Sequence, residues 1–118
     1  MSRNQESLID IAEAIKLIFQ YVEGTDSKTL AANIEKQDAI LRRITIIGEA
    51  TKRLSQDFRN QHPSVPWKKI AGMRDVITHE YNEVDLDEVW TVINENLPQL
   101  LKYIEPLVLS KNDETRGD

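Results

Sequence analysis

The chain has 118 residues, no cysteine and a net charge of −5. This length is sufficient for one domain with a modest core, and the lack of cysteine excludes disulfides and thiolate metal sites. No apolar run approaches the roughly 20 residues that cross a bilayer. Because residues 1–10 are polar and unlike a signal peptide, we expect a cytoplasmic protein without membrane contact.

The charged residues are distributed unevenly. Residues 36–74 carry nine basic and three acidic side chains, whereas residues 75–118 carry three basic and eleven acidic ones. A basic block of this kind is typical either of a solvated helix surface or of a surface that binds a polyanion. In the second case the block predicts four candidate ligands for an RNA backbone or an acidic partner: Arg42, Arg43, Lys52 and Arg53.

Apolar residues recur at helical spacing in two long segments of the first half. The first segment predicts a helix over residues 5–23, which Gly24 ends. The second predicts a long helix over residues 35–60, with a short additional helix possible over residues 28–33. Gly48 inside the long helix costs about 1 kcal/mol relative to alanine. A close approach by another helix would explain its presence.

Prolines divide the second half. Residues 62–66 break the helical pattern, and His62 in this loop is expected to be a surface residue rather than a ligand. Pro66 opens a new helix, since its fixed φ suits the first turn. We expect that helix to end near His79.

A final helix follows a polar turn. Asp85 is expected to be its N-cap, with Glu88 three residues later in a capping-box-like pair. The apolar stripe of this helix runs over residues 86–104. Pro98 should kink or divide it near Asn94.

Together these segments predict an all-α bundle of four main helices. We expect one domain over residues 1–109 and a disordered tail over residues 110–118. Trp67 and Trp90 are expected in the core, although either one can stack on a base if it lies at an exposed edge.

The segment from Arg74 to Tyr81 gathers an arginine, a histidine and a tyrosine. Arginine grips phosphate with a permanently charged fork, and histidine gives or takes a proton near neutral pH. Arg74 and His79 are therefore a minimal set for cutting a phosphodiester by acid–base chemistry without a metal ion. The alternative is structural, because a helix C-terminus favours histidine and an arginine beside a carboxylate forms a surface ion pair.

The spacing of these residues constrains the site. Arg74 and His79 are five residues apart, which places them about 140° out of phase on an ideal helix. Either the helix ends before His79, or the site combines residues from two chains of a symmetric dimer. Asp75 precedes His79 by four residues, so on a helix its carboxylate can orient the imidazole.

The segment 66–81 closely resembles the HepT-like toxin branch of the HEPN superfamily. The hallmark of that branch is Arg, four residues, His, one residue, Tyr, and all three positions match here. Further matches are Ile47–Ala50 in the long helix and Asp85, Trp90 and Leu97–Pro98 near the final one. The resemblance covers roughly residues 5–107.

The resemblance implies a HEPN-type bundle and the toxin of a type VII-like toxin–antitoxin pair. Such toxins are metal-independent endoribonucleases that need no cofactor and act as homodimers. Arg74 and His79 would be the catalytic pair, with Asp75 in support. A minimal nucleotidyltransferase antitoxin would transfer AMP to Tyr81 and so block the enzyme.

Two other functions fit the same residues. One is a non-catalytic HEPN module that binds a nucleotide or its partner enzyme through the motif. The other is a plain helical dimerisation scaffold.

Overall fold

The computed structural model describes residues 2–78 and 83–116, with side chains described as far as Val108. Its elements are α1 (Arg3–Val22), α2 (Ser27–Ala31), α3 (Ile34–Arg53), α4 (Gln56–Gln61), α5 (Trp67–Ala71), α6 (Met73–Ile77), α7 (Leu86–Thr91), the π-helical segment η2 (Val92–Asn96) and α8 (Leu97–Arg116). The described residues contain no strand, only an isolated antiparallel bridge between Thr78 and Val84. The all-α prediction is confirmed.

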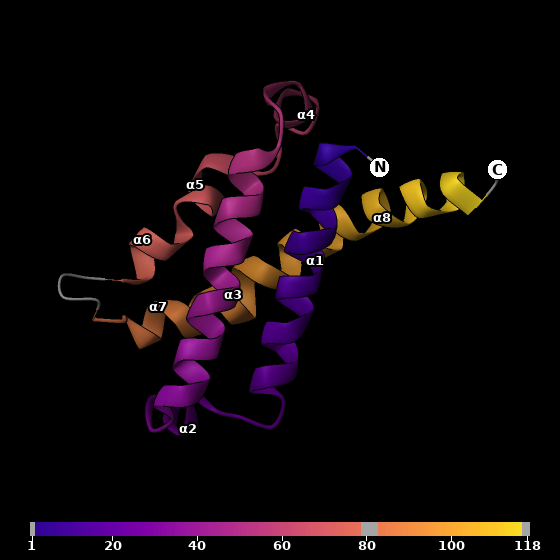
Figure 1. Cartoon of the computed structure of the whole chain (residues 1–118). Coiled ribbons are helices and arrows are strands. Elements are labelled where there is room, and N and C mark those ends of the chain that lie inside the picture. Colours follow the sequence, from indigo (N-terminus) through magenta and orange to yellow (C-terminus); the bar gives the residue numbers. More distant parts are fainter. Residues whose placement is uncertain (1, 79–82, 117–118) are drawn as a thin grey trace.

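α1 and α3 form the centre of the bundle. They lie side by side, α8 crosses behind them, and α5 and α6 lie on the side of α3 away from α1 (Figure 1). Burying a leucine or isoleucine side chain stabilises the fold by about 1.5–3 kcal/mol. The fully buried leucine and isoleucine side chains of the three long helices are Leu8, Ile11, Ile15 and Ile18 of α1, Ile40, Ile44 and Ile47 of α3, and Leu97 and Ile104 of α8.

The first elements agree with the sequence. α1 ends just before Gly24, whose φ of 72° lies in the left-handed region that favours glycine. The short additional helix over residues 28–33 is present as α2. Asp26 caps it by accepting a hydrogen bond from the Thr29 N–H, which lowers the pKa of the Asp26 carboxyl.

The second long helix is shorter than predicted. α3 ends at Arg53, and the Ser55 hydroxyl caps a separate helix, α4, by accepting from the Phe58 N–H. The Asn4 side chain, from the start of α1, hydrogen-bonds both the backbone N–H and the hydroxyl of Ser55. The prediction of one helix over residues 35–60 is wrong because a contact with the chain's first helix marks this break, and no glycine or proline does.

The helix that follows Pro66 is also divided. α5 stops at Gly72, which has the lowest helix propensity apart from proline. α6 then makes little more than one turn and ends at Ile77, after which Thr78 is extended. The helix expected to run to His79 therefore ends two residues earlier.

The start and the irregular turn of the last helix follow the prediction. The Asp85 side chain accepts from the Glu88 N–H and caps α7. The π-helical η2 ends at Asn96, two residues before Pro98, whose ring nitrogen has no hydrogen to donate. Here the Asn94 side chain donates to the carbonyl of Trp90 at 2.8 Å.

α8 continues as a helix to Arg116, where the sequence predicts a disordered tail. The domain boundary at residue 109 stays a prediction. Among the described helices, none combines the length and the apolar composition needed to cross a membrane.

Gly48 explains how closely α5 approaches α3. A Cβ at this position would lie 3.0 Å from the carbonyl oxygen of Ala71, which is tighter than ordinary van der Waals contact. The close approach expected for Gly48 is confirmed. α3 therefore contacts the backbone of α5 at this position.

We expect Gly48→Ala to destabilise the fold. Alanine gains about 1 kcal/mol of helix propensity, but overpacking against a backbone carbonyl costs about 1–3 kcal/mol. The net effect should lower the thermal unfolding midpoint by several degrees, measured by circular dichroism. Gly72→Ala is the matched control, since its Cβ would meet the Lys68 carbonyl oxygen at an ordinary 3.7 Å. An unchanged or raised midpoint for Gly48→Ala would contradict the account of this contact.

Candidate functional site

Arg74 lies on α6, and its side chain is exposed to solvent. Because α6 ends at Ile77, the helix ends before His79, which is the first of the two arrangements that the spacing allows. His79 and Tyr81 lie outside the described residues. Their positions, and the pairing of Asp75 with His79, stay predictions.

The chain is held together at both ends of the segment that contains His79. The isolated bridge joins Thr78 to Val84, and the Asp85 N–H donates to the Ile77 carbonyl at 2.7 Å. Ile77 itself is fully buried and anchors α6 in the core. Ile77 and Thr78 therefore lie beside Val84 and Asp85, at the end of the helix that carries Arg74.

The guanidinium of Arg74 is available to a ligand. It makes no hydrogen bond or ion pair with any residue that the structure describes, and the neighbouring Asp75 is likewise exposed. An exposed arginine with this freedom can bind a phosphate with its planar fork.

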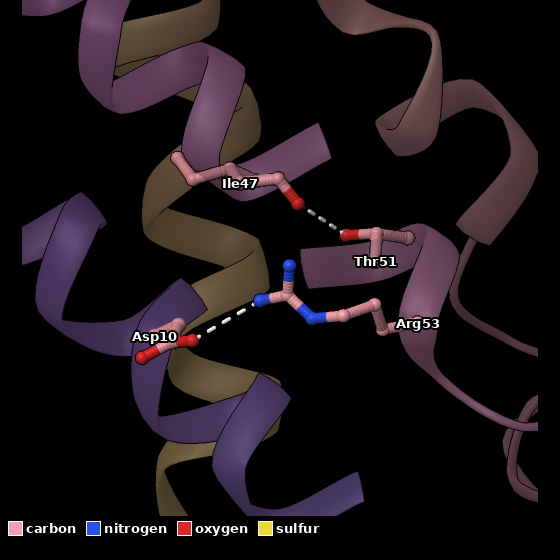
Figure 2. A network of polar contacts seen from close by, with 4 residues as sticks. All are labelled: Asp10, Ile47, Thr51 and Arg53. Atoms are coloured by element: carbon pink, nitrogen blue, oxygen red, sulfur yellow. Dashed lines mark hydrogen bonds and ion pairs between the residues drawn. The ribbon is translucent and has the colours of Figure 1, made fainter. Parts of the chain in front are cut away.

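The four basic candidates of α3 differ in exposure and in their partners. Arg53 pairs with Asp10 of α1 at 3.1 Å, as Figure 2 shows. Arg43 is half-buried, and its Nε is enclosed without a hydrogen-bond partner among the described residues. Arg42 and Lys52 are exposed. RNA binding by these four residues stays a prediction, and Arg42 and Lys52, which are exposed and form no ion pair with a described residue, are the better placed to provide it.

His62 has a structural contact that sequence analysis missed. It is half-buried at the end of α4, and its Nδ1 lies 2.8 Å from the hydroxyl of Tyr103 on α8. Its ring packs against Phe58, and its carbonyl accepts from the Trp67 indole N–H at 3.0 Å. These contacts tie α4, α5 and α8 together. A distance of 41 residues in sequence leaves no local signal for the pair.

The two tryptophans lie against the core as expected. Trp67 is buried on α5, while Trp90 on α7 is half-buried and packs against the core cluster.

A groove of about 530 Å³ opens between α5–α6 and α7–η2–α8. Met73 and Val76 of α6 line one wall, and Val92 and Leu100 line the other. Val76 is 52% exposed, although it is a large apolar side chain. No pattern in the sequence points to this groove, because only the folded chain brings its two walls together.

In the part of the chain that the structure describes, no group of three or more histidine, cysteine, aspartate or glutamate side chains is arranged to hold a metal ion. Metal independence stays a prediction.

Comparison with known proteins identifies the family. The family model described as Ribonuclease HepT-like matches residues 11–107. The chain is 36% identical over 104 residues to the "Probable ribonuclease HepT" of Thermococcus cleftensis, covering 88% of this chain and 94% of that protein. The chain therefore belongs to the HepT-like ribonuclease family, as the resemblance of residues 66–81 implied.

A second relative is longer than this chain. The "Gamma-glutamylcyclotransferase and putative RNase MJ0434" of Methanocaldococcus jannaschii is 39% identical over 108 residues, which are 88% of this chain but 49% of that protein. The chain thus spans about half the length of this relative. No solved structure matches the chain.

Proposed function

We propose that the protein is an endoribonuclease that cleaves RNA without a metal ion. The observation that carries this proposal is the exposed Arg74, which has no partner among the described residues and lies on the short helix α6, which ends one residue before the Thr78–Val84 bridge. Membership in a ribonuclease family supports it.

The reaction follows from the groups available. RNA supplies its own nucleophile, the 2′-hydroxyl, which attacks the adjacent phosphorus while the bond to the 5′-oxygen breaks. His79 would remove the 2′-hydroxyl proton or donate a proton to the leaving 5′-oxygen. Arg74 would bind the phosphate and stabilise the charge that develops on it. The products are a 2′,3′-cyclic phosphate and a 5′-hydroxyl.

The active enzyme is proposed to be a homodimer. Two protomers related by a twofold axis would bring two copies of Arg74 and His79 into one cleft. Each RNA phosphate would then contact more than one cation. A single chain contributes only one copy of Arg74, on the short helix α6.

The biological role is proposed to be that of a toxin, in a type VII-like pair with a minimal nucleotidyltransferase. AMP on the Tyr81 hydroxyl would place a negatively charged phosphate and an adenosine near Arg74. The added phosphate would compete with the RNA phosphate for the arginine. Inhibition would follow without any change of fold.

Arg74→Ala and His79→Ala should each lower RNA cleavage by on the order of 10²–10⁴-fold. Because Arg74 is exposed, the thermal unfolding midpoint of the Arg74→Ala variant should equal that of wild type. Arg74→Lys should also be severely impaired, because an ammonium lacks the two-pronged grip. The measurement is cleavage of a labelled RNA, with exposed Lys102→Ala on α8 as control.

EDTA should leave cleavage unchanged, and inhibition reversed by magnesium would contradict the metal-free mechanism. If purified, unmodified protein binds nucleotide but cuts no RNA, the non-catalytic HEPN module replaces this proposal.

Tyr81→Phe should keep substantial nuclease activity and should escape neutralisation by the nucleotidyltransferase. Mass spectrometry after incubation with that enzyme and ATP should place AMP on Tyr81. AMP on Tyr21 or Tyr103, or full neutralisation of the phenylalanine variant, would refute this account of control.

Light scattering at micromolar concentration should give twice the mass of one chain. A monomer that cleaves RNA at full rate would refute the requirement for a shared cleft.

A further inference from the structure

The groove between α5–α6 and α7–η2–α8 has the size and floor of a small-ligand site. Its volume of about 530 Å³ falls within the roughly 300–1,000 Å³ of such sites. Apolar side chains from both walls form its floor, among them Ile70 and Met73 on one side and Val92 and Leu100 on the other. A flat ring can lie against this surface and so be shielded from water.

The rim of the groove is polar and free to bind. Asn96 and Gln99 are exposed at its edge, and neither side chain forms a hydrogen bond with another described residue. Two carboxylates, Glu88 and Glu95, lie on the same wall, and one ammonium, Lys69, lies on the other. The rim therefore carries a net negative charge, which suits a neutral ring with N–H donors better than a phosphate.

Helix α6 connects this groove to the proposed site of cleavage. Met73 and Val76 of α6 line the groove, whereas Arg74 is not part of its lining. At about 100° per residue, Arg74 leaves the helix on the flank opposite to Val76. If the scissile phosphate of an RNA strand binds at Arg74, a neighbouring base reaches the groove by crossing only the width of one helix, about 10 Å.

We propose that this groove binds one nucleobase of the RNA, next to the cleavage site, and selects bases that carry amino groups. The inference rests on the proposed ribonuclease function and assigns the specificity of that reaction. The base would lie on the apolar floor, as single-stranded bases do on protein surfaces. Glu95 accepts N–H bonds from the amino group of cytosine, adenine or guanine, and Asn96 and Gln99 bind a donor–acceptor edge in pairs. Uracil has no amino group: its N3–H is flanked by two carbonyl oxygens, which a carboxylate repels, so it is disfavoured.

The size and chemistry of the groove argue for a base over a protein segment. A stable protein interface buries about 800 Å² on each partner, far more than the contact area of one ring. A second copy of this chain bound at the groove is the alternative to a base. The experiment below distinguishes the two.

The test is cleavage of a random-sequence RNA pool, with sequencing of the new 5′-hydroxyl ends. Wild-type protein should show a fixed position near the cut at which uracil is depleted. Glu95→Gln and the double variant Asn96→Ala, Gln99→Ala should each reduce that bias by roughly tenfold or more. Because all three side chains are exposed, the unfolding midpoints should not change. The total rate of cleavage should fall less than the bias does.

Two exposed residues outside the groove lining are matched controls. Glu13→Gln on α1 and Gln61→Ala at the end of α4 make the same chemical changes and should leave the bias as in wild type.

Each other outcome decides against the inference. Wild-type cleavage without a positional base preference, or a preference that the rim variants leave intact, overturns it. Rim variants that alter the mass in light scattering but not the base preference identify the groove as an interface between copies.

If wild-type protein cuts no RNA, the proposed function fails separately, and base recognition is then read from fluorescence anisotropy. Short 2′-O-methyl RNAs rich in cytosine or adenine should bind more tightly than oligouridine, and Glu95→Gln should remove the difference. Equal affinity for these RNAs overturns the inference.

Discussion

The close contact between Gly48 and the backbone of Ala71 positions the candidate site. α3 is part of the packed centre of the bundle, and α5 can lie against it only because a hydrogen replaces a side chain at residue 48. α6 follows after one glycine and is anchored by the buried Ile77. The position of Arg74 on the surface thus depends on how closely α3 and α5 pack at Gly48 and Ala71.

α6 makes about one turn, yet it separates two kinds of surface. One flank presents Arg74, a cation without a partner among the described residues. The other flank contributes Met73 and Val76 to the apolar groove. RNA likewise combines a charged phosphate backbone with largely apolar base rings. The two flanks of α6 therefore offer a charged surface to phosphate and an apolar surface to rings. The helix is short because Gly72 precedes it and extended Thr78 follows it.

The opposite wall of the groove depends on a proline. Pro98 cannot donate a backbone hydrogen bond, and the widened η2 turn, which ends two residues before it, places Glu95 and Asn96 at the rim. Tyr103, further along α8, reaches the same groove and also contacts His62. The chain thereby links the loop before α5 to the wall that faces it. The hydrogen bond between His62 and Tyr103 thus fixes α8 relative to the loop before α5.

The sequence by itself determined the elements that local chemistry controls. Helical spacing of apolar residues located α1 and the core of α3, the Asp85–Glu88 pair marked the start of α7, and Pro98 marked the irregular turn. The order of residues in the segment 66–81 identified the family. These signals work because caps, turns and periodicity involve residues within a few positions of one another.

Tertiary structure alone decided the rest, since it brings together residues that are distant in sequence. Asn4 divides the predicted long helix by capping contacts with Ser55, 51 residues away. Asp10 pairs with Arg53 and so separates one basic candidate from the others. One wall of the groove comes from residues 64–76 and the other from residues 88–103. Neither stretch carries a sequence pattern that predicts a groove. The side chains present at each position follow from local order, but their neighbours follow from packing, which only the folded chain establishes.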